Sequence, residues 1–62
     1  MTSQERSRLK RLCYLSKRGF ADGFSLDDVN FCHRLLKKFP DEYRKIQCEA
    51  SDQAVSELQP NL

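Results

Sequence analysis

Hydrophobic and polar residues follow one another with helical spacing in three segments of the chain. In the first segment, residues 4–18, apolar side chains recur at intervals of three and four from Leu9 and Leu12 onward. Thr2 and Glu5 stand three residues apart, which is the spacing of a capping box at the start of a helix. The pattern therefore predicts a first helix over residues 4–18.

Residues 19–24 form a connector between the first two segments. Gly19 follows two basic residues, at the position where a helix commonly ends in a left-handed conformation. Phe20 and Phe24 are too apolar for an ordinary exposed loop, so we expect them to turn inward or to pair across a subunit interface. The sequence does not separate a short extended segment here from a turn.

The second segment begins with the strongest local signal in the chain. Ser25 is a favourable N-cap residue, and Asp27 and Asp28 fall in the first turn, where the helix dipole favours negative charge. Phe24 and Val29 have the spacing of a hydrophobic staple around this cap. A second helix is predicted from Ser25 to the basic residues before Phe39.

The apolar residues of this second helix cover more than one narrow stripe. They are Leu26, Val29, Phe31, Cys32, Leu35, Leu36 and Phe39. So wide an apolar surface predicts a helix that is buried on two sides. Because the chain offers only three elements, we expect one of those sides to face another molecule.

Pro40 separates the second helix from a third. The residue before a proline is disfavoured in helical geometry, and proline itself suits the first turn of a helix. The apolar face weakens after Cys48, so the third helix either continues to about residue 58 or frays near Ser51. Residues 59–62 are expected to form a loose tail.

The predicted fold is therefore all-α: one domain over residues 1–58 with two to three short helices. A chain of 62 residues buries a small core, which leaves little net stability, and it carries a surplus of large apolar groups. Homodimerisation is the common solution, and we expect it here. The residues predicted for core and interface are Phe20, Phe24, Phe31, Leu35 and Phe39.

Charge is unevenly distributed along the chain. Residues 1–18 have a net charge of +5 and the remainder −3, which gives +2 for the whole. The basic side chains of the first helix are Arg6, Arg8, Lys10, Arg11, Lys17 and Arg18. They are candidates for binding an anion such as nucleic acid, and equally for neutralising the acidic part of the same chain or of a second copy.

The cysteines and the absence of apolar runs bear on compartment and cofactors. Cys13, Cys32 and Cys48 are odd in number and contain no CxxC pair, which favours reduced thiols over a secreted disulfide scaffold. Together with His33 they match no zinc spacing, so no metal or other cofactor is expected. The alternative to reduced thiols is an intermolecular disulfide formed on oxidation. Without a signal sequence or a membrane-spanning run, the expected location is cytoplasmic.

Catalytic motifs are missing from the sequence. It has no GxGxxG, P-loop, HExxH or GxSxG pattern. His33 is adjacent to Cys32 on a helix, where neighbours point about 100° apart and do not form a catalytic pair. The carboxylates of Asp27 and Asp28 are explained by their place in the first helical turn. We therefore expect a binding protein rather than an enzyme.

The outline of the whole chain resembles the small early-region accessory proteins of lambda-like temperate bacteriophages. The likeness rests on a charged N-terminal helix without a signal, a helix opening Ser-Leu-Asp-Asp at Ser25, and the break Phe-Pro-Asp-Glu-Tyr-Arg-Lys at residues 39–45. The resemblance implies a dimeric, non-enzymatic modulator of infection or host physiology. Its partner would be a host or phage protein in the host cytoplasm, and no site residues are carried over.

Overall fold

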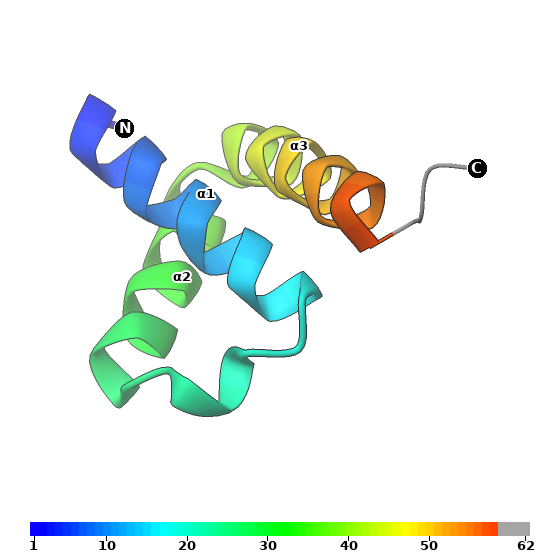
Figure 1. The fold of residues 1–62 in the computed structure, drawn as a ribbon. Coiled ribbons are helices and arrows are strands. Elements are labelled where there is room, and N and C mark those ends of the chain that lie inside the picture. The colour runs from blue at the N-terminus through cyan, green and yellow to red at the C-terminus, as the bar shows by residue number, and fades with distance from the viewer. Residues whose placement is uncertain (59–62) are drawn as a thin grey trace.

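Three α-helices and one 3₁₀ turn follow one another in residues 1–58, the part of the chain that the computed structural model describes (Figure 1). Helix α1 spans Ser3–Lys17, the 3₁₀ turn η1 spans Ala21–Gly23, α2 spans Leu26–Lys38 and α3 spans Pro40–Leu58. The all-α prediction is confirmed. The predicted tail at residues 59–62 lies outside the described residues.

Helix α1 begins and ends through hydrogen bonds that the sequence predicted. Thr2 Oγ1 accepts the amide of Glu5 at 3.1 Å, and the Glu5 carboxylate accepts the amide of Thr2 at 2.9 Å, which completes a capping box. At the other end Gly19 has a φ of +88°. Its amide donates to the carbonyl of Ser16 at 3.1 Å, and that of Phe20 to the carbonyl of Leu15 at 2.9 Å, which is a Schellman motif.

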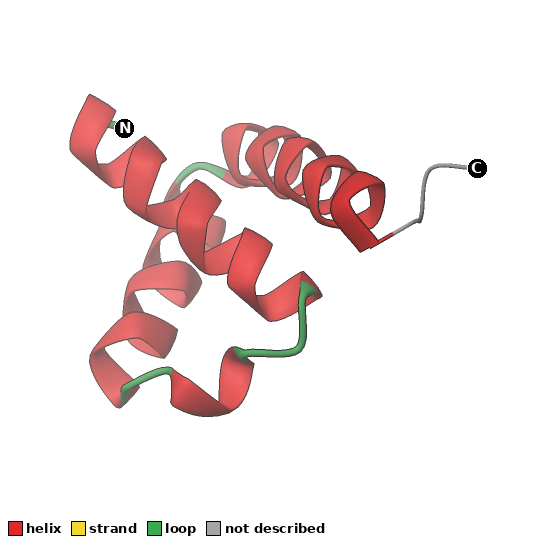
Figure 2. Cartoon of the chain, in the orientation of Figure 1, coloured by secondary structure: helices red, strands yellow, loops and turns green. Residues whose placement is uncertain are grey.

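The connector is a turn and not a strand. Ala21–Gly23 form a single 3₁₀ turn, and no strand is present in residues 1–58 (Figure 2). The extended alternative for residues 19–24 is therefore wrong. The Schellman motif reverses the chain at Gly19, and the amide of Phe24 then bonds the carbonyl of Ala21 at 3.0 Å, so the backbone curls before α2 begins.

Helices α2 and α3 are separated by one residue. Ser25 and Asp28 form a second capping box, with bonds of 3.2 and 3.1 Å, at the start of α2. Phe39 has φ −133° and ψ 65°, outside helical geometry, and Pro40 is the first residue of α3, as predicted. Of the two alternatives for the third helix, the continuous one to Leu58 is correct.

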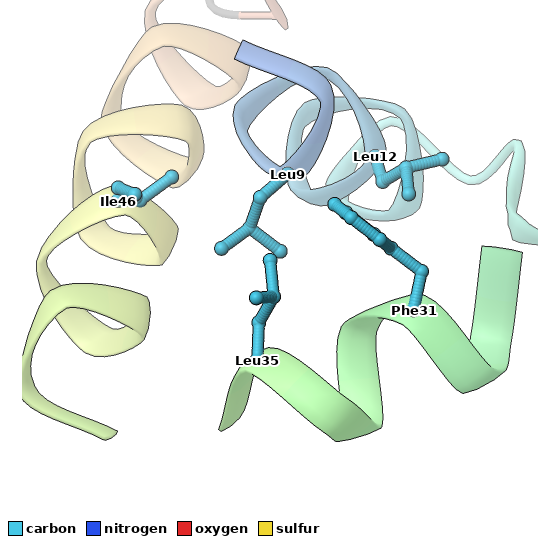
Figure 3. Packing of buried hydrophobic residues seen from close by; sticks show 5 residues of the cluster. All are labelled: Leu9, Leu12, Phe31, Leu35 and Ile46. Atoms are coloured by element: carbon cyan, nitrogen blue, oxygen red, sulfur yellow. The ribbon is translucent and has the colours of Figure 1, made fainter. Parts of the chain in front are cut away.

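The core lies where α1 crosses the other two helices. Leu9 of α1 points between Leu35 of α2 and Ile46 of α3, and Leu12 faces the ring of Phe31 (Figure 3). All five side chains are buried. Burying a side chain of this size contributes about 1.5–3 kcal/mol, so this cluster supplies most of the hydrophobic stabilisation of the fold.

Small residues bring α1 close to α3. Ala50 and Ala54 are fully buried on α3, and the α1 and α3 backbones lie against each other more extensively than any other pair of helices. An alanine side chain lets two helix axes approach at the short end of the usual 8–10 Å range. None of the helices in residues 1–58 is long and apolar enough to cross a membrane.

Candidate functional site

The five residues predicted for core and interface divide between the interior and the surface. Phe31 and Leu35 belong to the core of this single chain. Phe24 and Phe39 are half-buried and pack against that core. Phe20 alone stays open, with 57% of its surface exposed. Four of the five residues therefore contribute to packing within one chain, and two of these, Phe31 and Leu35, are fully enclosed by it.

Half of the basic residues predicted to bind an anion donate to carboxylates of the same chain. Arg6 lies 3.3 Å from Glu42, Arg8 contacts two aspartates, and Arg18 lies 2.9 Å from Glu57. These ion pairs join the basic first helix to the acidic elements that follow. Of the three uses that the sequence left open for its charge asymmetry, neutralisation within the chain accounts for these arginines.

Three side chains of α2 contact the Arg8 guanidinium. Its Nη2 donates to Asp27 Oδ2 and to Asp28 Oδ1, each at 3.0 Å, and its guanidinium lies 4.2 Å from the centroid of the Phe31 ring. The hydrogen bond from Arg8 and the cap at Ser25 lower the pKa of Asp28 below its ordinary value. The ion pairs of Arg8 with Asp27 and Asp28 therefore join α1 to the start of α2, next to the buried Phe31 ring.

A second polar cluster ties α1 to the end of α3. The Tyr14 hydroxyl donates to Glu57, and Arg18 Nη1 lies 2.9 Å from both the Tyr14 oxygen and the Glu57 carboxylate. The bond from Tyr14 favours the ionised carboxylate, which lowers the pKa of Glu57 and raises the pKa of Tyr14. This arrangement commits Arg18 to a structural contact.

The other three basic residues of α1 are exposed. Lys10, Arg11 and Lys17 enter no ion pair within residues 1–58. Lys10 and Arg11 border a shallow depression of about 570 Å³, which Tyr14 and Gln53 also line. A cationic surface of this kind attracts anions. It has only three of the six basic side chains that were predicted to bind an anion, because the other three are in ion pairs within the chain.

One face of α2 presents apolar side chains to solvent. Leu26 is 76% exposed and Leu36 is 46% exposed, and Val29 and His33 between them are also exposed. These four positions follow the spacing i, i+3, i+7, i+10, so they lie along one side of the helix. We call Leu26, Val29, His33 and Leu36 the α2 face. The single chain buries the Phe31–Leu35 side of α2, and burial of the other side by another molecule stays a prediction.

A groove of about 470 Å³ adjoins the α2 face and shares Val29 and His33 with it. Side chains from all three α-helices line it. They are Leu12, Cys13, Ser16, Lys17, Phe24, Val29, Cys32, His33, Tyr43, Gln47, Cys48 and Ser51. No carboxylate is among them. The groove is therefore lined by apolar groups and thiols, with Lys17 and His33 as its basic side chains.

The three thiols differ in exposure within this groove. Cys48 is exposed, whereas Cys13 and Cys32 are half-buried. Burial, with a smaller contribution from nearby Cys32, raises the pKa of Cys13 to about 11. A protonated thiol is a poor nucleophile and a poor metal ligand. Within residues 1–58, no three His, Cys, Asp or Glu side chains come together in a group that could hold a metal ion.

The residues predicted for core and interface are mostly phenylalanines and do not include the aliphatic residues that stay exposed. In the sequence, Leu26, Val29 and Leu36 stand out only as part of a wide apolar surface. Their spacing of three and seven residues places them on one side of the helix and away from Phe31, but it does not indicate which of the two sides α1 covers. No protein-family model, curated protein or solved structure matches this chain.

Proposed function

We propose that this chain is a small, non-enzymatic regulatory protein that acts by protein–protein interaction through the α2 face. The observation that carries the proposal is the exposure of Leu26, Val29 and Leu36 along one side of a helix whose other side holds the core. Apolar side chains gathered on one exposed surface are typical of an interface. If the apolar residues of α2 served only the core, they would be confined to the side of the helix that carries Phe31 and Leu35.

The resemblance to early-region phage proteins supports a role in infection. Under this proposal the protein works in the host cytoplasm, where its target is a host or phage protein. The homodimer expected from the sequence is part of the proposal. Its electrostatic rationale is weaker than the sequence indicated, because Arg6, Arg8 and Arg18 already pair within the chain. The apolar α2 face supplies the reason for association instead.

Nucleic-acid binding through α1 is the second candidate. It is supported by the exposure of Lys10, Arg11 and Lys17. Three contacts of this kind give a weak complex that dissociates steeply with salt. We expect no mobility shift of duplex DNA or of RNA at physiological salt. A shift that persists there and disappears in Lys10→Glu/Arg11→Glu would favour this candidate over the α2 face.

An affinity capture from bacterial host lysate tests the proposed function. The bait is the wild-type chain, compared with Leu26→Glu/Leu36→Glu, which places two charges on the α2 face. Val55→Glu is the matched control, because Val55 is an exposed apolar residue on α3. We expect a protein that is retained by wild type and by Val55→Glu but is lost from the face variant. Identical captures by all three baits would contradict the proposal.

A further inference from the structure

We infer that the α2 face and the adjoining groove bind an acidic amphipathic helix of a partner protein, with its apolar stripe on the α2 face and its carboxylates toward Lys17 and Lys37. The inference rests on the proposed function, because it states the chemistry of a partner for the same surface. The distribution of charge around the α2 face carries it, and the proposed function makes no use of that distribution.

The exposed surface of α2 is cationic after its first turn. Asp27 and Asp28 both accept hydrogen bonds from Arg8, so the acidic start of the helix is engaged with α1. Beyond them α2 contains no carboxylate. Its basic side chains are all exposed, and they are His33, Arg34, Lys37 and Lys38. The helix dipole favours cations in the last turn, and their side chains also give the solvent-facing surface of α2 a positive charge.

Two lysines near the α2 face have no partner in the part of the chain that the structure describes. Arg34 and Lys38 each lie 5.7 Å from the centroid of a phenylalanine ring, which engages their charge. Lys17 and Lys37 are exposed, enter no ion pair and lie over no aromatic ring within residues 1–58. These two lysines are therefore the cations that an acidic partner reaches without breaking a contact.

The two lysines lie beside different parts of the apolar surface. Lys37 follows His33 by four positions, so it is the next side chain along that edge of the α2 face. Lys17 lines the groove from α1, and Val29 and His33 belong to both the groove and the α2 face. No carboxylate lines the groove. An occupant of this surface thus meets apolar side chains with a lysine at the α2 edge and another at the α1 wall.

An acidic amphipathic helix matches this combination of apolar and cationic groups. From Leu26 to Leu36 the α2 face is about 15 Å long, or about three helical turns. A helix laid along it presents an apolar side chain at every third or fourth position and places glutamates or aspartates beside that stripe. The groove of about 470 Å³ takes the larger side chains at one edge of the stripe. Nucleic acid brings negative charge but no aliphatic groups for the leucines.

A titration with designed peptides tests this partner chemistry. One peptide of about 18 residues, or about five helical turns, has leucines along one face and glutamates elsewhere, and its counterpart has lysine in place of every glutamate. Each is added to the ¹⁵N-labelled full chain at about 50 µM, a concentration at which we expect weak self-association to be minor. We expect the glutamate peptide to shift the amides of Val29, His33 and Leu36 and of the groove residues, with a dissociation constant of about 0.1–1 mM. The lysine peptide should leave them unmoved.

Charge-reversal variants test the assigned lysines. Lys17→Glu/Lys37→Glu should weaken binding of the glutamate peptide about tenfold, because two attractions become repulsions. Lys10→Glu/Lys45→Glu is the matched control, since it changes the net charge equally at exposed lysines outside the α2 face and the groove. Circular dichroism of both variants verifies that the helices are kept. Equal losses in the two variants would show that only the net charge of the chain matters, and would overturn the inference.

A membrane surface is the competing occupant, because anionic lipid also combines negative charge with apolar groups. The concave groove favours a shaped helix over a flat bilayer, so we expect no cosedimentation of the chain with phosphatidylglycerol vesicles. Cosedimentation that is lost in Leu26→Glu/Leu36→Glu, together with no shift by the glutamate peptide, would overturn the inference in favour of lipid.

The inference and the proposed function fail separately. Binding of the two peptides with equal strength, or no shift up to about 2 mM glutamate peptide, overturns the acidic helix as the partner. If Leu26→Glu/Leu36→Glu nevertheless loses a captured protein that Val55→Glu keeps, the α2 face serves a partner of different chemistry and the proposed function stands. If the face variant captures the same proteins as wild type, the proposed function fails whatever the peptides do.

Discussion

Leu35 and Leu36 are adjacent leucines of α2 in opposite environments, and replacing each by alanine tests which side of the helix holds the core. Leu35 packs against Leu9 (Figure 3) and is 1% exposed. Leu36 is 46% exposed on the α2 face. Leu35→Ala removes buried methyl groups and leaves a cavity, so it should lower the free energy of unfolding by about 3 kcal/mol. Leu36→Ala removes partly solvated groups without a cavity, and it should lower it by about 1 kcal/mol or less.

The loss expected for Leu35→Ala is large compared with the total free energy of unfolding. A domain of this size has a free energy of unfolding of roughly 3–9 kcal/mol, so Leu35→Ala should leave the chain marginally folded. Urea unfolding followed by circular dichroism at 222 nm, with the protein at about 5 µM so that weak self-association adds nothing, gives both numbers. Equal losses for the two variants, or a larger loss for Leu36→Ala, would show that the core does not lie on the Leu35 side of α2.

Three further outcomes follow from local contacts. Ser25→Ala removes the oxygen that caps α2 and should lower the free energy of unfolding by about 1 kcal/mol in urea; no change would mean that the cap is not formed in solution. Ala50→Leu forces a larger side chain into the closely packed α1–α3 contact and should destabilise by about 1–3 kcal/mol in the same assay, whereas a stabilised variant would show that space remains there. At pH 8, iodoacetamide should modify Cys48 much faster than Cys13, whose pKa is about 11, as peptide mass spectrometry over time would show; equal rates would contradict the half-buried position of Cys13.

The helix ends were predictable because neighbours in sequence decide them. The Ser25–Asp28 capping box needs only two residues three positions apart, and Gly19 needs only its own freedom to adopt a positive φ. Pro40 likewise fixes the break between α2 and α3 through its own ring. Such signals act over a few residues and do not depend on how the helices pack.

The division of α2 into a buried and an exposed side was not predictable in the same way. Its apolar residues surround much of the helix, and the direction from which α1 approaches decides that Phe31 is covered and Leu36 is not. The alanines of α3 show the same limit. Ala50 and Ala54 marked a weakening apolar face in sequence, yet they are fully buried, since their small size lets α1 come close.

The fate of the basic residues also depends on tertiary contacts. Arg6 and Glu42 are 36 positions apart, and Arg18 and Glu57 are 39 apart. The charge pattern established that opposite charges were present in different parts of the chain. It contained no information on which of them meet, because that follows from the packing of α1 across the other two helices (Figure 1).

Backbone amide shifts of ¹⁵N-labelled protein, recorded over a concentration series, test directly whether the α2 face is where the chain associates. We expect concentration-dependent shifts at Leu26, Val29, His33 and Leu36 and at the groove residues beside them, with Lys10 and Arg11 unmoved. Shifts centred on the basic surface of α1, or spectra that do not change at any concentration, would contradict a self-pairing α2 face.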